Sequence, residues 1–226
     1  MIALITGRDL CTEKNKRISC STSGMAYAGG ACGFLKLSIG EDRPWSFNVV
    51  RTMAHEFAHN LGCVHDGEPP MQGFVGHPGA IACPWSWGYI MSYVQEDTRE
   101  YYFSSCCAAQ IRYFARHSLR TCLFKNNTYK EVKRSEELPG FITTLDTICN
   151  NTYGRAKFTY IYDKTRKFQG CRIPCKVEHA EADYYPAMAK AVDGTNCSST
   201  GDMICIRGGC VPRNKATGIK LRRLAS

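Results

Sequence analysis

The sequence predicts an α+β domain over residues 1–124, a linker at 125–140, a small disulfide-rich module at 141–212 and a basic tail at 213–226. Three observations lead to this prediction. Short apolar runs typical of strands precede a stretch of helical periodicity. The fourteen cysteines divide into eight in the first domain and six in the module, so each part can close its own disulfides. From Phe141 onwards, cysteine, glycine and turn residues dominate and no long periodic helix follows.

Three strands are expected before the first helix. Ile2–Thr6 is a short run of strand-forming apolar residues and predicts a buried strand. Gly24–Cys32 alternates small and larger residues and holds three glycines, which suits an edge strand approached closely by another backbone. Phe34–Ile39 alternates apolar and polar residues, as a strand does. The polar segment Arg8–Ser23 lies between them, tied down by two cysteines.

A helix is predicted from Phe47, with Ser46 as its N-cap, because apolar residues then recur at helical spacing as far as Leu61. Asp66–Ser86 is rich in glycine and proline and is expected to be a loop. Cys106–Leu119 shows helical spacing again and would close the domain.

Two further segments carry weaker signals. Asp97–Tyr102 is polar and is expected to be an exposed loop. Within the module, Ala187–Val192 predicts a short helix. His77, His117 and His179 have no ligand spacing to one another, so we expect them on the surface or in loops.

The most informative stretch runs from His55 to Asp66 and reads H-E-x-x-H-x-x-G-x-x-H-D. On a helix, residues four apart lie on one face, so the imidazoles of His55 and His59 would lie side by side. Gly62 can take a left-handed conformation and end the helix, which lets His65 return as a third ligand. Three nitrogen ligands leave a fourth tetrahedral position for water, the arrangement of one catalytic zinc ion.

Glu56 follows the first ligand and is placed to hold this water and take its proton. The alternative is three unrelated histidines on a core helix. It is disfavoured, because five fixed positions recur by chance roughly once in 10^7 starting points. Cys63 lies between the ligands and is either a thiolate ligand or a half-cystine; the oxidising context favours the disulfide.

The cysteine content indicates an oxidising, extracellular compartment. Glycosylation sequons begin at Asn126, Asn150 and Asn196 and fit a secreted product. No run has transmembrane length, and the first residues do not form a signal peptide. We therefore expect an N-terminally truncated piece of a longer secreted precursor.

The formal net charge is +9, and much of the excess lies in Lys125–Arg134 and Arg213–Arg223. Nucleic-acid binding and a solvated basic surface are the two interpretations. The cysteines and sequons favour the solvated surface and argue against nucleic acid, while leaving room for contact with anionic extracellular polysaccharide.

The histidine motif, with Asp66 after the third histidine, resembles the zinc motif of the metzincins in their reprolysin (ADAM/ADAMTS) branch. Gly88–Ser92 resembles the family's Met-turn, whose methionine, here Met91, lies beneath the zinc ligands; a plain core methionine is the alternative. Gly24–Cys32 resembles the edge strand that pairs with substrate, and the module, with its D-G-T-N-C at 193–197, resembles the disintegrin-like or cysteine-rich segment of ADAMTS-type proteases. The whole is similar to arthropod secreted reprolysins, including those of tick saliva.

The resemblance implies an incomplete zincin-type catalytic domain and a zinc endopeptidase acting on extracellular matrix or plasma proteins. Ala28 and Gly29 would either offer backbone hydrogen bonds to substrate or simply form a tight edge. Lys125 stands near the position of a family calcium ligand, which argues against a calcium site. The competing hypothesis is a non-catalytic extracellular binding protein that acts through its cysteine-rich module.

The resemblance also implies disulfide pairings. It pairs Cys32 with Cys122, and it pairs Cys83 with either Cys106 or Cys107.

Overall fold

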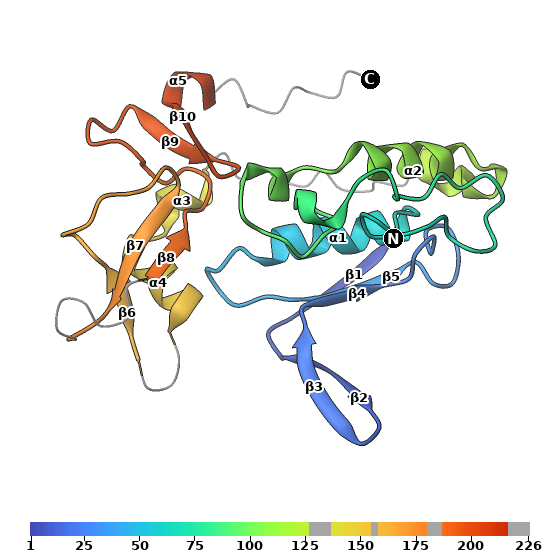
Figure 1. Ribbon diagram of the computed structural model, residues 1–226, viewed down its shortest axis with the longest axis horizontal. Helices are drawn as coiled ribbons and strands as arrows, with labels where there is room; N and C mark the ends of the chain where they lie inside the picture. Colours follow the sequence, from blue (N-terminus) through green and yellow to red (C-terminus); the bar gives the residue numbers. More distant parts are fainter. Residues whose placement is uncertain (127–136, 155–157, 180–186, 217–226) are drawn as a thin grey trace. The chain divides into compact units, whose positions relative to one another are not determined.

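The structure is a computed structural model that describes residues 1–126, 137–154, 158–179 and 187–216 (Figure 1). It divides into two compact units. The first consists of Met1–Pro44 and Asn48–Glu131, and the second of Trp45–Phe47 and Val132–Ser226. Helices and strands are mixed and seven disulfides are formed, so the expected α+β fold with a disulfide-rich part is confirmed.

A three-stranded sheet in the order β1-β5-β4 supports the first unit. The central strand β5 (Leu37–Glu41) pairs in parallel with β1 (Ile2–Thr6) and antiparallel with β4 (Gly24–Ala26). The strand expected at Phe34–Ile39 therefore begins three residues later. Figure 1 shows helix α1 running across this sheet.

The expectation of a buried strand at Ile2–Thr6 is wrong. The side chains of Ile2, Leu4 and Ile5 are each more than half exposed. The reason is position in the sheet: β1 is an edge strand with a single partner, and α1 packs mainly against β5 and β4.

The strand expected over Gly24–Cys32 is shorter than the alternating pattern suggested, because the chain leaves the sheet after Ala26. The backbone N–H groups of Gly29 and Ala31 donate to the carbonyls of His59 and Asn60, at 2.8 and 3.0 Å. These carbonyls belong to the last turn of α1 and have no partner within the helix. This segment thus caps the helix instead of extending the sheet.

The polar segment between β1 and β4 is a hairpin of β2 (Leu10–Lys14) and β3 (Arg17–Thr22), closed by the Cys11–Cys20 disulfide. Its two turn residues, Asn15 and Lys16, have φ of 52° and 60°, as a tight two-residue hairpin turn requires. Figure 1 shows the hairpin extending away from the sheet.

Helix α1 (Val49–Asn60) carries the histidine motif. The predicted cap is wrong: Asn48, and not Ser46, is the N-cap residue, and it makes no side-chain capping bond. The chain turns away from the helix at Gly62, two residues after its end, where φ is +91°. The N–H groups of Gly62 and Cys63 reach back to His59 and Ala58 carbonyls, both at 2.9 Å, which is a Schellman motif.

Short helices follow along the chain: η1 (Trp85–Trp87), η2 (Thr98–Tyr101), α2 (Ser105–Arg116) and η3 (Ser118–Phe124). The exposed loop predicted at Asp97–Tyr102 is thus wrong in part, because it contains η2 and Glu100 is buried. The helix predicted at Cys106–Leu119 is present as α2, but it begins one residue earlier and ends at Arg116. It begins behind Ser104, whose hydroxyl accepts from the Cys107 N–H, and His117 then takes an extended conformation.

In the second unit, α4 (Leu145–Tyr153) packs against a sheet of β6 (Tyr160–Tyr162), β7 (Arg172–Val177) and β8 (Ala187–Lys190). Further elements are α3 (Pro139–Ile142), the hairpin of β9 (Met203–Ile206) and β10 (Gly209–Pro212), and α5 (Arg213–Ala216). The helix predicted at Ala187–Val192 is therefore wrong. Ala187–Lys190 pairs with β7 and buries Ala189 against Ile173, so partner strands override the local signal.

The disulfides segregate as the even cysteine counts predicted. Four lie in the first unit, joining Cys11–Cys20, Cys32–Cys122, Cys63–Cys107 and Cys83–Cys106. Three lie in the second, joining Cys149–Cys175, Cys171–Cys205 and Cys197–Cys210. The pairing of Cys32 is confirmed, Cys63 is a half-cystine, and Cys106 is the partner of Cys83. Of the predicted linker and basic tail, residues 127–136 and 217–226 lie outside the described residues.

Candidate metal centre

Three imidazoles converge at the carboxyl end of α1. One potential ligand atom of each of His55, His59 and His65 lies within 4.8 Å of the others. The Nε2 atoms of His55 and His59 are 3.0 Å apart. Two nitrogens bound to one tetrahedral ion at zinc distances are separated by about 3.4 Å, so this spacing is near that of a ligand pair.

The second nitrogen of each ring is held by an oxygen. Nδ1–H of His55 donates to the Ile90 carbonyl at 2.7 Å, and Nδ1–H of His59 donates to the Cys63 carbonyl at 2.8 Å. Nδ1 of His65 lies 3.1 Å from a Glu68 carboxylate oxygen. Such bonds fix the tautomer and leave the Nε2 lone pairs free for a metal, so these residues fit a zinc ion.

Burial keeps the helical ligands neutral. Burial, together with the neighbouring His59 and His65, lowers the pKa of His55 to about 3, against the opposing hydrogen bond to the Ile90 carbonyl. Burial also lowers the pKa of His59. A neutral imidazole is the form that binds a metal, so burial favours the ligand form of both rings.

Glu56 is buried beside them, with 5% of its surface exposed. This burial raises the pKa of its carboxyl to about 7. The glycine at the start of β4 makes room for the side chain, because a Cβ on Gly24 would lie 2.6 Å from Glu56 Oε1.

The segment after η1 contacts the helix that carries His55 and His59. Met91 is fully buried and packs with Ala58, Cys63 and Cys107. The neighbouring Ile90 carbonyl is the one that accepts from His55.

Gly62 and Asp66, the two remaining residues of the histidine motif, contact neighbouring segments of the first unit. A Cβ on Gly62 would lie 2.8 Å from the Phe114 ring, so φ and close packing both require glycine. Asp66 is buried. Its carboxylate accepts from the Ser104 hydroxyl at 2.6 Å, and its N–H donates to the Met91 carbonyl at 3.0 Å. It thus joins the third-ligand loop to the start of α2 and to the turn that holds Met91.

The proposed substrate contacts differ from each other. Ala28 is exposed, whereas Gly29 is buried and its N–H is already paired with the His59 carbonyl. The three sequon residues, Asn126, Asn150 and Asn196, are all exposed.

Four residues near the histidines were not anticipated from the sequence. Arg51, one helical turn before His55, donates to the carbonyls of Tyr89, Ile90, Ser92 and Glu100.

Tyr93 places its hydroxyl 3.4 Å from His65 Nε2, and its ring and that of Trp85 pack against His65. Glu68 is the fourth. Only helical spacing to His55 could have indicated Arg51; the others depend on loop conformation.

His77 lies in a loop, which is one of the two expected positions, but its side chain is buried. Its Nε2–H donates to the Gly62 carbonyl at 2.8 Å, and its Nδ1 accepts from the N–H groups of Met71 and Gly79. The ring therefore ties the 67–83 loop to the helix end, a contact between residues distant in sequence.

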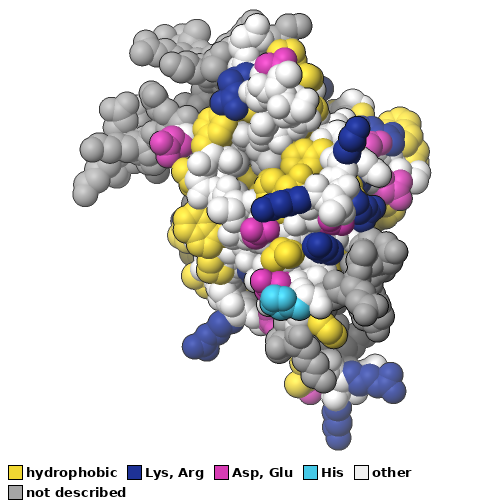
Figure 2. All heavy atoms as spheres, turned by 90° about the vertical axis from the view of Figure 1, so that its left-hand side faces the viewer, with side chains coloured by type: hydrophobic (Ala, Val, Ile, Leu, Met, Phe, Trp, Pro, Cys, Tyr) yellow, Lys and Arg dark blue, Asp and Glu magenta, His cyan; other side chains and the backbone are white. Residues whose placement is uncertain are grey.

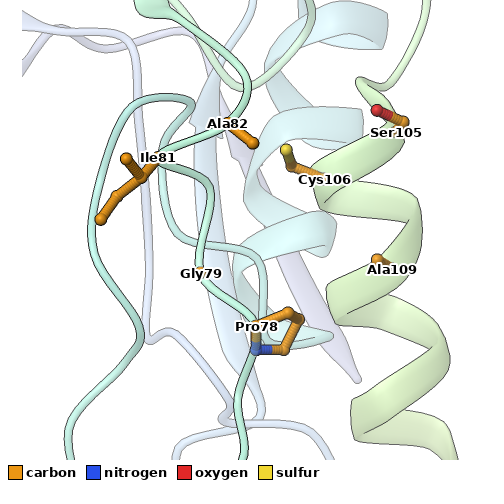
Figure 3. A pocket seen from close by; sticks show the side chains of 7 residues that line it. All are labelled: Pro78, Gly79, Ile81, Ala82, Ser105, Cys106 and Ala109. Carbon is orange, nitrogen blue, oxygen red and sulfur yellow. The ribbon is translucent and has the colours of Figure 1, made fainter.

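A separate hollow of about 430 Å³ lies between the 78–82 loop and the start of α2 (Figure 3). Its lining consists of small or apolar side chains, one serine and a disulfide-bonded cysteine: Pro78, Gly79, Ile81, Ala82, Ser105, Cys106 and Ala109. It offers no titratable group and is not the candidate site.

The surface charge shows no single basic stripe on the face in Figure 2. There, lysine and arginine side chains of the described residues are interspersed with acidic and hydrophobic ones. No helix in the described part of the chain combines the length and apolar character needed to cross a membrane.

Comparison with known proteins identifies relatives that cover residues of both the first and the second unit. Residues 17–104 match metallo-peptidase family M12, in its reprolysin group. A "disintegrin and metalloproteinase with thrombospondin motifs like" protein of Bombyx mori is 31% identical over 93% of this chain and 30% of its own length. The venom metalloproteinase antarease-like TtrivMP_A of Tityus trivittatus is 37% identical over 55% of this chain and 32% of its own.

Human "disintegrin and metalloproteinase with thrombospondin motifs 19" is 28% identical over 94% of this chain and 16% of its own length. The chain thus spans about a third or less of these curated relatives. The match to family M12 includes the three histidines, Glu56 and Met91. Residues 17–104 therefore belong to a reprolysin-type metalloprotease domain of family M12.

Proposed function

We propose that this chain is the zinc endopeptidase part of a secreted protease and that it hydrolyses peptide bonds of extracellular proteins, with Glu56 as general base. The observation that carries the proposal is the convergence of three Nε2 atoms, each ring anchored at Nδ1, beside a buried carboxylate. Membership of the M12 family supports zinc and peptide hydrolysis as the chemistry.

The histidines and Glu56 have separate roles in the proposed reaction. A zinc ion bound by the three imidazoles would acidify a water and polarise the substrate carbonyl. Glu56 accepts the proton of the attacking water and passes it to the leaving nitrogen. Burial raises its pKa to about 7, and a bound cation nearby would lower it, which favours the carboxylate form that accepts the proton.

The substrate is proposed to bind as an extended strand along β4. Gly24–Ala26 forms the edge of the sheet and has β5 on one side only. Backbone pairing on its other side gives affinity with little sequence preference. Because the Gly29 N–H is used internally, Ala28 is the better candidate for a further backbone contact. Side-chain preference would come from the wall formed by Trp85 and Tyr93 beside His65.

Secretion is part of the proposal. All fourteen cysteines are paired, which is stable only in an oxidising compartment. The exposed sequon residues suit glycosylation. Extracellular matrix or plasma proteins are the proposed substrates, and anionic polysaccharide is a further proposed contact through the basic segments at 125–134 and 213–223.

A second candidate function is extracellular binding through the cysteine-rich unit. It is favoured by one observation: this unit has its own core around Ile148 and Ile173 and closes its three disulfides internally. Such a unit can recognise a partner while the zinc domain serves only as a scaffold.

The test is peptide hydrolysis by the full chain, produced in an oxidising secretory host. We expect turnover of a quenched fluorescent peptide library that a zinc chelator abolishes and zinc restores. Glu56→Ala should retain zinc and lose at least about 100-fold in kcat/KM. The matched control is Glu13→Ala on the distant hairpin, which should cleave normally. Equal turnover by Glu56→Ala and the unmutated chain would refute the proposed mechanism, and absence of turnover with zinc fully bound would favour the binding function.

A further inference from the structure

The third zinc ligand is held differently from the other two. His55 and His59 are fixed by backbone carbonyls. His65 is held by a carboxylate: Glu68 Oε1 lies 3.1 Å from its Nδ1, and Glu68 Oε2 accepts from its backbone N–H at 3.0 Å. The Glu68 side chain thus contacts both the ring and the backbone of the same ligand.

We propose that Glu68 is the positioning residue of the third ligand and that it sets how tightly the site retains its metal. The inference rests on the proposed function, since it takes the three imidazoles to be a zinc site. It assigns Glu68 no contact with the metal or the substrate; Glu68 acts through His65.

The need for such a residue follows from where His65 lies. It follows the Gly62 turn, outside α1, so the helix does not restrain it. Trp85 and Tyr93 pack edge-on against the ring, with centroids 5.7 and 5.5 Å away. Ring packing limits tilt but does not decide which nitrogen faces the other histidines. The Nδ1 hydrogen bond to Glu68, at 3.1 Å, selects that orientation and is shorter than the 3.4 Å contact between Nε2 and the Tyr93 hydroxyl.

Glu68 is itself held in place by backbone bonds. Its N–H donates to the His65 carbonyl at 3.1 Å, and its carbonyl accepts from the Ala80 N–H at 2.8 Å. The preceding Gly67 donates to the Ala80 carbonyl at 3.0 Å. Ala80 is close in sequence to Cys83, which is bonded to Cys106 on α2. The carboxylate is therefore presented by a loop anchored to the body of the unit.

The charge of Glu68 adds a second effect. An imidazole that donates to a carboxylate is a stronger electron donor than one that donates to a carbonyl. The His65 side chain is 23% exposed and that of Glu68 is 50% exposed, so water competes for both. The competing interpretation is an ordinary exposed ion pair of no consequence, as many are.

Zinc affinity separates these interpretations, measured on the full chain by competition with a chromophoric chelator. We expect Glu68→Ala to raise the zinc dissociation constant about 10- to 100-fold. Glu68→Gln keeps the shape and one acceptor, so its affinity should fall between those of Glu68→Ala and the unmutated chain. Glu13→Ala and Glu13→Gln make the same changes on the hairpin and should leave affinity unchanged. The visible spectrum of the cobalt-substituted chain should change with Glu68→Ala and not with Glu13→Ala, because only the first alters the geometry at a ligand.

Two outcomes overturn the proposal: zinc affinity of Glu68→Ala within twofold of the unmutated chain, or equal loss in the Glu13 variants. Near-ultraviolet circular dichroism of the metal-free proteins excludes a general folding defect. Failure of the proposed function is a distinct result, namely stoichiometric zinc in the unmutated chain without peptide cleavage, and it leaves the affinity comparison valid. An unmutated chain that takes up no zinc would overturn both.

Discussion

We expect Gly24→Ala to lower the catalytic activity strongly while lowering the free energy of unfolding only slightly. Gly24 opens β4, directly over the α1 face that carries Glu56. A Cβ there would lie 2.6 Å from Glu56 Oε1 and 2.7 Å from Thr52 Cγ2. Its φ is not in the left-handed region, so alanine brings no backbone strain and the effect is contact alone.

The size of the effect follows from these distances. To regain an ordinary contact of 3.4 Å, the Glu56 carboxylate must move by about 0.8 Å. Displacement of a catalytic group by about 1 Å costs roughly 100-fold in rate. Both contacts are with movable side-chain ends, so the free energy of unfolding should fall by only about 1 kcal/mol, the low end of overpacking costs. We therefore expect kcat/KM to fall about 10- to 100-fold while zinc content stays unchanged.

The assay is peptide cleavage with zinc quantified in the same samples, alongside denaturant unfolding. The control is Gly7→Ala at the end of β1, where a Cβ meets nothing nearer than 3.8 Å and activity should be normal. Adding Thr52→Ser to Gly24→Ala removes the methyl contact and should restore stability without restoring rate. A Gly24→Ala protein with kcat/KM within twofold of the unmutated chain would refute the reasoning that β4 sets the position of Glu56.

Two further predictions concern the charged residues of α1. Burial raises the pKa of Glu56 from 4.5 to about 7. In the metal-free protein, the contribution of this group to the free energy of unfolding therefore falls as the pH rises from 4.5 to 7 and is lowest above pH 7. Below pH 4.5, Glu56→Gln should therefore match the stability of the metal-free unmutated chain. Between pH 4.5 and 7 it should become increasingly more stable than that chain, by at most about 3 kcal/mol. Denaturant unfolding from about pH 4 to 8 measures the two free energies of unfolding, and a difference between them that does not change with pH would contradict the prediction. Arg51→Ala removes the guanidinium bonds that collect the carbonyls around Ile90, so we expect the His55 ring to lose its anchor and the zinc dissociation constant to rise about 10-fold or more. Arg51→Lys should not rescue it, because one ammonium cannot replace the planar fork; full rescue by lysine in the same chelator competition would show that only positive charge matters.

Local geometry made part of the site predictable from the sequence. Two histidines four apart on a helix must share a face, and a glycine at the helix end fixes where the third can return. The convergence of His55, His59 and His65 is therefore predictable from the sequence. The contact of Glu68 with His65 is not, because it depends on a loop whose conformation is set by bonds to Ala80, further along the chain.

The same distinction explains the fold. The apolar run Ile2–Thr6 indicated a strand correctly, but burial depends on which strand the helix covers, and α1 packs mainly over β4 and β5. The choice between Cys106 and Cys107 as partner of Cys83 was open because they are adjacent in sequence. Helical geometry settles it: successive residues point about 100° apart, so buried Cys107 faces Cys63 and Cys106 faces the 78–83 loop.

The segregation of the disulfides has a consequence for limited proteolysis of the chain. Since the last cysteine of the first unit is Cys122 and the first of the second is Cys149, no covalent cross-link spans the peptide between them. A single cut in that interval divides the chain into two fragments that migrate separately even without a reductant. Each fragment would keep its full set of cross-links, so one cut is enough to end the covalent connection between the two sets of disulfides.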